Sequence, residues 1–234
     1  MDNSEDFSAM MLSCINMASQ VASPVIAQFV SIANPVLGLI FRRVFSHFKK
    51  DDSTMIECAR LGIAYSTAAE TVNGFIAKNA TLRDDGFLDD IKGYPYAPVD
   101  LILDAAIRNV IIDPEIEKAE LYGKFIGAVP FCHDLSRERM ILLNNIINQL
   151  TIGDIKVLKE FYPGTPIDLT SLEVSVRDGG DENDFERHIR LMKLQRLGLI
   201  VRQKPFRTDL ALQNEKISTI GAEVLRFLGF PQKE

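Results

Sequence analysis

A stretch without charge near the start of the chain limits its folding more than any other feature. Residues 7–41 contain no Asp, Glu, Lys or Arg, and the stretch ends at two consecutive arginines. Its second part, Val21 to Phe41, is about as long as a membrane-spanning helix, which needs about 20 apolar residues. However, Pro24 and Pro35 divide it into shorter pieces, and each proline fits the first turn of a new helix. We therefore expect two or three short helices buried against protein, with a membrane-active segment at residues 21–41 as the alternative.

The last of these pieces, residues 35–50, has the pattern of an amphipathic helix with a basic end. Apolar side chains recur at helical spacing, and the piece closes with two lysines. Its apolar face suits a partner helix, an oligomer contact or the surface of an anionic membrane. The residues expected to make this membrane or oligomer contact are Val36, Leu37, Ile40, Phe41 and Phe45.

The composition is that of a folded globular chain. Hydrophobic residues make up 47% of the sequence and charged residues 25%, which excludes wholesale disorder. The net charge of -6 gives no general attraction to nucleic acid or to anionic lipid. The acidity belongs to residues 1–149, which carry 13 basic and 19 acidic side chains, whereas residues 150–234 carry 13 of each.

The cysteines and the first residues indicate the compartment. Cys14, Cys58 and Cys132 are odd in number and far apart, which is typical of a reducing cytosol and predicts no disulfide framework. The opening "MDNSED" is acidic where a secretory signal would be basic. We expect a cytoplasmic protein, with peripheral membrane contact as the alternative.

Residues 1–149 are expected to form a helical domain. Thr54 and Glu57 have capping-box spacing at the start of a long apolar-periodic stretch, and Ser136 can cap a later helix. Two further helices are expected at residues 98–112 and 114–129, the second capped by Asp113. No useful length of this part alternates with period two. The sequence therefore predicts an N-terminal helical bundle.

Residues 150–234 mix short helices, strands and glycines. Thr151 and Asp154 have capping-box spacing before a first helix, and "PGTPIDL" then predicts a turn. "TSLEVSV" is ambiguous between a helix and a strand. A helix ended by Gly198 follows, then a strand "LIVRQ", a tip "KPFRTD", a returning strand within "LALQNEKIS" and a last helix. This order is that of a winged helix. The expected fold class is mainly α, a helical bundle followed by a small winged-helix-like α+β module.

The helix before Gly198 would be the recognition helix of such a module. The apolar Phe185, Ile189, Leu191 and Met192 fall on one arc of its helical wheel, and the basic residues fall on the opposite arc, the ordinary solvent face of an amphipathic helix. Residues 183–207 carry seven basic and two acidic side chains. The candidate nucleic-acid contacts are Arg187, Arg190, Lys193, Arg202 and Arg207.

Acidic side chains oppose this DNA-binding interpretation. Residues 181–186 contain four carboxylates at the start of the helix, where base contacts are usually made and where phosphate would be repelled. A packing or protein-contact role for the helix is therefore favoured over DNA recognition.

No catalytic constellation is found along the chain. Motifs of the types GxSxG, HExxH, GxxxxGK and CxxC are absent from the sequence. Cys132, His133 and Asp134 are consecutive, but adjacent side chains seldom point at one another, so a loop is favoured over a nucleophile and its base. Three histidines, spread along the chain, supply a metal site poorly. We expect no catalytic residue, no metal and no cofactor.

Several segments resemble a known group of proteins. They are "EIEKAELYGKFIGAVPF", "LLNNIINQLTIGDIKVLKEF", "LQRLGLI" and "ISTIGAEVLRFLGF". Together they are similar to the Abi-alpha group of bacterial proteins, associated with abortive infection and phage resistance, and the likeness covers roughly residues 105–230. The shared positions are mainly apolar residues and glycines, so the resemblance implies an architecture and transfers no catalytic residues.

These observations favour a non-enzymatic interaction protein of bacterial or phage origin. The resemblance implies a role in antiphage defence by abortive infection. A protein partner or self-association is expected. The alternatives are a winged-helix DNA-binding regulator and an effector that acts on membranes through residues 21–41.

Overall fold

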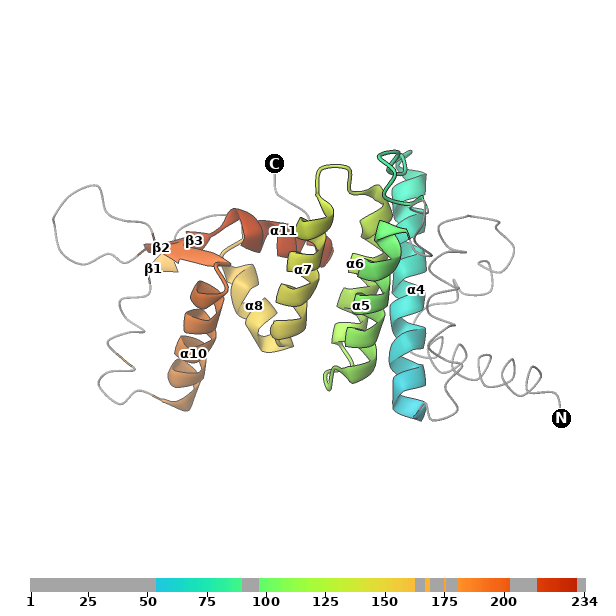
Figure 1. Cartoon of the computed structure of the whole chain (residues 1–234). Helices are drawn as coiled ribbons and strands as arrows, with labels where there is room; N and C mark the ends of the chain where they lie inside the picture. Colours follow the sequence, from blue (N-terminus) through green and yellow to red (C-terminus); the bar gives the residue numbers. More distant parts are fainter. Residues whose placement is uncertain are drawn as a thin grey trace. The chain divides into compact units, whose positions relative to one another are not determined.

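The computed structural model describes residues 54–89, 97–162, 167–168, 175, 181–202 and 214–230. Among these residues the chain is mainly helical, which confirms the expected fold class at that level (Figure 1). None of the described helices combines the length and the apolar character that a membrane crossing requires. The uncharged residues 7–41 and the helix expected at residues 35–50 lie outside the described residues. The same holds for all five predicted membrane or oligomer contacts, Val36, Leu37, Ile40, Phe41 and Phe45.

The chain divides into two compact units between Asn148 and Gln149. The described helices of the first unit are α4 (Met55–Ala77), α5 (Pro98–Ile112), α6 (Lys118–Ala128), the short 3-10 helix η1 (Val129–Phe131) and α7 (Arg137–Gln149). In the second unit lie α8 (Ile152–Glu160), β1 (Ile167–Asp168), α10 (Glu182–Arg196), β2 (Ile200–Arg202), β3 (Asn214–Ile217) and α11 (Thr219–Phe227).

Local capping signals set several helix starts as predicted. The Thr54 hydroxyl accepts a hydrogen bond from the Glu57 backbone N–H at 3.3 Å, and the Glu57 carboxylate accepts one from the Thr54 N–H at 2.7 Å. The Ser136 hydroxyl accepts from the Arg139 N–H at 3.2 Å at the start of α7. These bonds satisfy backbone donors that the first turn of a helix leaves without partners.

One helix of the first unit begins later than expected. Asp113 and Pro114 predict a helix from residue 114, but α6 begins at Lys118. The Asp113 carboxylate instead accepts a hydrogen bond from the Glu115 N–H at 3.0 Å and forms an ion pair with the Lys118 ammonium. An ion pair between two side chains only five residues apart therefore accompanies the later start of α6.

Two glycines let α6 pack closely along α4. A Cβ placed on Gly123 would lie 2.5 Å from the Ala64 carbonyl oxygen, and one on Gly127 would lie 2.5 Å from the Ala68 carbonyl oxygen. Real Cβ atoms essentially never come so close to other atoms. The two glycines are one turn apart on the same face of α6, so the backbones of α4 and α6 approach more closely than side chains would allow. The core of this unit is built around this crossing, and α5 contacts both helices.

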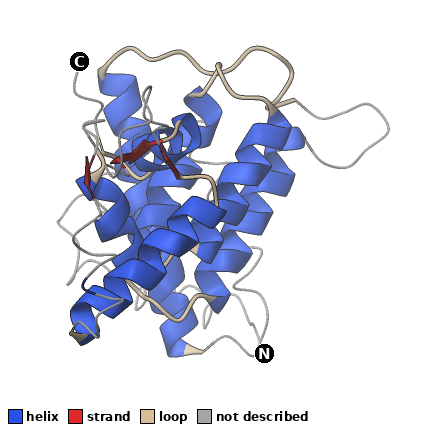
Figure 2. Cartoon of the chain, turned by 90° about the vertical axis from the view of Figure 1, so that its left-hand side faces the viewer, coloured by secondary structure: helices blue, strands red, loops and turns tan. Residues whose placement is uncertain are grey.

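The second unit contains a three-stranded antiparallel sheet of order β1-β3-β2. Strands are drawn in red in Figure 2. Ile200 pairs with Ile217 and Arg202 with Glu215, so the strand and returning strand expected around the tip are confirmed. Ile167 and Asp168 were expected to be part of a turn, but they form a strand because β3 offers its second edge to them. The tip residues themselves, 203–213, lie outside the described residues.

Helix ends in this unit follow the sequence signals. The Thr151 hydroxyl accepts from the Asp154 N–H at 3.1 Å and the Asp154 carboxylate accepts from the Thr151 N–H at 2.8 Å, as the capping-box spacing predicts. Gly198, with φ of 71°, ends α10 in the left-handed region that favours glycine. The Ser218 hydroxyl caps α11 by accepting from the Gly221 N–H at 3.0 Å.

Candidate interaction surface on helix α10

Helix α10 is the element to which sequence patterns assign a recognition role. The Asp181 carboxylate caps it by accepting a hydrogen bond from the Asp184 N–H at 2.8 Å. Carboxylates in the first turn and cations in the last turn, Lys193 and Arg196, complement the helix dipole. The helix contacts α8 and β2. Its inner face buries Leu191 and Leu194.

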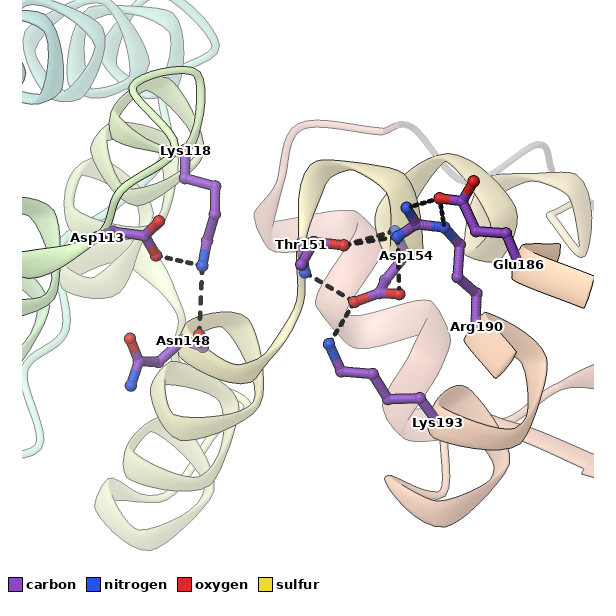
Figure 3. Close-up of polar contacts among 8 residues, drawn as sticks. All are labelled: Asp113, Lys118, Asn148, Thr151, Asp154, Glu186, Arg190 and Lys193. Atoms are coloured by element: carbon purple, nitrogen blue, oxygen red, sulfur yellow. Dashed lines mark hydrogen bonds and ion pairs between the residues drawn. The ribbon is translucent and has the colours of Figure 1, made fainter. Parts of the chain in front are cut away.

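The carboxylate of Asp154 on α8 holds the basic side of α10. Only 2% of its side chain is exposed. One oxygen accepts from the Arg190 guanidinium at 3.3 Å, and the other accepts from the Lys193 ammonium at 2.5 Å and from the Thr151 backbone N–H at 2.8 Å (Figure 3). Two cations from α10 and one backbone donor from α8 therefore meet at a single buried anion.

Arg190 makes further contacts that hold its guanidinium against α8. It donates to the Thr151 hydroxyl at 2.9 Å, and its Nε donates to the Glu186 carboxylate one turn earlier on α10 at 3.1 Å. The guanidinium covers Gly153 so closely that a Cβ at that position would lie 2.3 Å from Arg190 Cζ. The absence of a side chain at Gly153 is what admits the guanidinium.

The pKa of Asp154 reflects these contacts. Burial alone would raise the pKa of its carboxyl group, because a charged group loses solvation in the interior. The hydrogen bond from Lys193 and those from the backbone and hydroxyl of Thr151 outweigh burial, so the pKa of Asp154 lies below its ordinary value. The pKa of Arg190 is raised above its ordinary value, chiefly by its hydrogen bond to Glu186. Both groups are charged at neutral pH.

Acid should weaken the attachment of α10 to α8. Because the pKa of Asp154 is lowered in the folded chain, its charge stabilises the folded state above about pH 4, the ordinary range of aspartate, and this contribution is lost as the pH falls through the lowered pKa. At pH 7 we expect Asp154→Asn to lower the free energy of unfolding by about 2 kcal/mol, the scale of hydrogen bonds to charged groups.

Urea unfolding followed by circular dichroism at pH 7, 4 and 2 measures this dependence. The difference between Asp154→Asn and the unchanged chain should shrink towards pH 2. Glu186→Gln is the matched control, since this carboxylate is 57% exposed and its loss should cost less than about 0.5 kcal/mol. If Asp154→Asn lowered the free energy of unfolding by the same amount from pH 7 to pH 2, the charge of Asp154 would not be what stabilises the folded state.

The structure gives three of the five candidate nucleic-acid contacts acidic partners. Arg190 and Lys193 pair with Asp154, and the Arg187 guanidinium pairs with Glu160 of α8 at 2.5 Å. The side chain of Arg202 and the whole of Arg207 lie outside the described residues. The three paired cations come together along the side of α10 that faces α8. The side chains of Arg187, Arg190 and Lys193 are 42%, 26% and 35% exposed, so the basic arc is only in part a solvent face.

Apolar side chains take the outward position instead. Phe185, Ile189 and Met192 are 56%, 50% and 56% exposed, whereas Leu191 from the same predicted arc is buried. The three exposed residues follow one another at spacings of four and three, so they form a continuous stripe along the helix. We call this set of three residues the α10 stripe.

The helical wheel placed its members on one arc, together with Leu191 and opposite the basic residues, but did not predict their exposure. The carboxylates at positions 154 and 160, on the helix expected before α10, were the signal that the basic arc had partners within the unit.

The consecutive Cys132, His133 and Asp134 lie in the turn between η1 and α7. The His133 Nε2 is hydrogen-bonded at 2.9 Å to the backbone carbonyl of Thr81, which ties this turn to the segment after α4. Among the described residues, no three His, Cys, Asp or Glu side chains are grouped so that they could hold a metal ion.

Comparison with protein-family models, with curated proteins and with solved structures finds no match to this chain.

Proposed function

We propose that this chain acts through contacts with other proteins and without catalysis. In this proposal the second unit is a winged-helix-like module. Its helix α10 binds a protein, whereas the corresponding helix of a DNA-binding module would bind duplex DNA. The winged-helix part of the proposal is supported by the element order α8, β1, α10, β2, β3 and by the sheet order β1-β3-β2. In that architecture the helix before the β-ribbon is the recognition helix. Helix α10 comes directly before β2 and β3 in the chain, which supports this part of the proposal.

The orientation of α10 is the single observation that carries the proposal. Phosphate contacts require cations that can exchange their counterions for the DNA backbone. Arg187, Arg190 and Lys193 are instead paired with Glu160, Glu186 and Asp154, so their three positive charges are balanced by three negative ones. The α10 stripe offers half-exposed apolar area, which is the kind of surface that marks a protein contact.

The resemblance of residues 105–230 to the Abi-alpha group supports a setting in bacterial antiphage defence. Those shared segments are apolar and glycine positions, and they transfer no catalytic residue. A role in which the chain senses or blocks another protein is consistent with such a pattern. The location that goes with it is the cytoplasm.

The purified full chain and a mixed-sequence duplex of about 30 base pairs test the proposal. Fluorescence anisotropy between 50 and 200 mM salt should show only weak, non-specific binding, with a dissociation constant of about 10 µM or above. Phe185→Ser, which keeps every charge, should leave this binding unchanged. Submicromolar binding that falls steeply with salt and is weakened by Arg187→Gln would contradict the proposal. So would hydrolysis of nucleotide or nucleic acid at a rate typical of enzymes.

A further inference from the structure

The α10 stripe is flanked by opposite charges at equal distances from its centre. Glu182 and Arg196 are exposed and lie seven residues before and seven residues after Ile189. Phe185 and Met192 lie between them. Along this face the order is therefore Glu182, Phe185, Ile189, Met192 and Arg196, at alternating spacings of three and four residues. All five residues share one side of the helix. Neither Glu182 nor Arg196 forms an ion pair with another described residue.

We propose that the α10 stripe is the contact with a second copy of this chain, formed by two α10 helices packed antiparallel about a two-fold axis at Ile189. The inference rests on the proposed function, since it names the partner of the same surface. A two-fold interface uses one patch twice, so that patch must complement itself. Antiparallel pairing places Glu182 of each copy beside Arg196 of the other. It also packs Ile189 of one copy against Ile189 of the other.

Charge excludes the parallel alternative. Parallel helices would set Glu182 against Glu182 and Arg196 against Arg196, which repel each other. The cations beside the stripe do not disturb the antiparallel arrangement, because Lys193 is paired with Asp154 and Arg190 with Glu186. The face of α10 that carries the stripe therefore complements a second copy of itself only when the two helices are antiparallel.

The size of the contact indicates a reversible dimer. One pair of helices of 15 residues is smaller than a standard protein interface, which buries roughly 1,200–2,000 Å². Removal of Phe185, Ile189 and Met192 from water supplies the main driving force. We expect a dissociation constant on the order of 10 µM, within reach of sedimentation equilibrium.

Charge exchange within the full chain tests the pairing. Glu182→Arg alone and Arg196→Glu alone each convert two attractive contacts into two repulsive ones, so each should weaken self-association about tenfold. An equimolar mixture of the two variants should restore it, since every contact between the two different copies is again between opposite charges. The double variant E182R/R196E should also associate like the unchanged chain.

Apolar variants separate this contact from other forms of self-association. Ile189→Asp should weaken the dimer at least tenfold, because it places two carboxylates at the two-fold axis. Leu101→Asp is the matched control, since Leu101 is exposed to a similar degree on α5 and lies outside the stripe. Circular dichroism and thermal melts check that each variant is folded. Since Ile189 is half-exposed, its substitution should leave the fold intact.

Two outcomes would overturn the inference. One is a chain that stays monomeric up to about 200 µM, well above the expected dissociation constant. The other is self-association that survives Ile189→Asp or that the mixture of charge variants fails to restore. Either result leaves the proposed function standing, because that function fails only on tight, salt-dependent duplex binding or on turnover.

Discussion

Replacing Gly127 by leucine is expected to unfold the first unit or to destabilise it by at least about 3 kcal/mol. The Cβ of any residue here would lie 2.5 Å from the Ala68 carbonyl oxygen and 2.8 Å from the Thr71 Cβ. The nearer contact is a backbone atom, which cannot rotate away, so α6 would have to move off α4. A typical domain is stable by about 5–15 kcal/mol, so this loss is a large fraction of the total.

Thermal unfolding of the full chain, followed by circular dichroism, measures the effect. Gly127→Ala should cost less than Gly127→Leu but still destabilise, because its methyl group already meets the Ala68 carbonyl. Gly74→Ala on α4 is the matched control. A Cβ at Gly74 meets nothing within 4 Å, so the exchange should stabilise the helix by up to about 1 kcal/mol. If Gly127→Leu and Gly127→Ala melted at the same temperature as Gly74→Ala, the close crossing of α4 and α6 would be absent.

The second large effect is expected for Lys118→Met. The side chains of Lys118 and Asp113 are only 3% and 6% exposed and form an ion pair, and the Lys118 ammonium also donates to the Asn148 carbonyl at 3.2 Å (Figure 3). Methionine fills a similar space but leaves the Asp113 carboxylate buried without its cation. Breaking a buried pair in this way costs about 3–5 kcal/mol.

A double-mutant cycle isolates the pair. Adding Asp113→Asn to Lys118→Met removes the orphaned charge, so the double variant should be more stable than Lys118→Met alone in urea unfolding. Asp104→Asn is a control of the same type. Its partner Arg108 is 69% exposed, and the loss of this surface pair should cost less than about 0.5 kcal/mol. A double variant less stable than either single variant would show that the two side chains do not act as a pair.

Local signals predicted much of the fold. The capping boxes at Thr54 and Thr151 and the glycine stop at Gly198 involve residues within one helical turn of each other, so the sequence alone defines them. The strands β2 and β3 were also expected from a local signal, because they lie on either side of a predicted tip in the sequence. Two-residue strand β1 was missed, since Ile167 and Asp168 are too short a stretch to show a period.

Ion pairs between side chains explain the remaining differences. The start of α6 depends on an ion pair between Asp113 and Lys118, which no capping rule includes. The orientation of α10 depends on Asp154 and Glu160 of α8. A helical wheel shows which residues share a face, but it does not show which face points inward when carboxylates of a neighbouring helix attract the basic side. The sequence therefore grouped the apolar residues of α10 on one arc but did not predict that three of them are exposed.

The guanidinium of Arg190, lying over Gly153, makes these two positions a single unit of evolutionary change. A Cβ at position 153 would lie 2.3 Å from Arg190 Cζ, so the guanidinium, the flexible end of that side chain, would have to shift from its place beside Asp154. A lineage that acquires a bulkier residue at 153 is therefore expected to change residue 190 or the carboxylate at 154 as well. Covariation among these three sites, rather than separate invariance of each, is the pattern by which distant descendants of this chain would preserve the hold of α8 on α10.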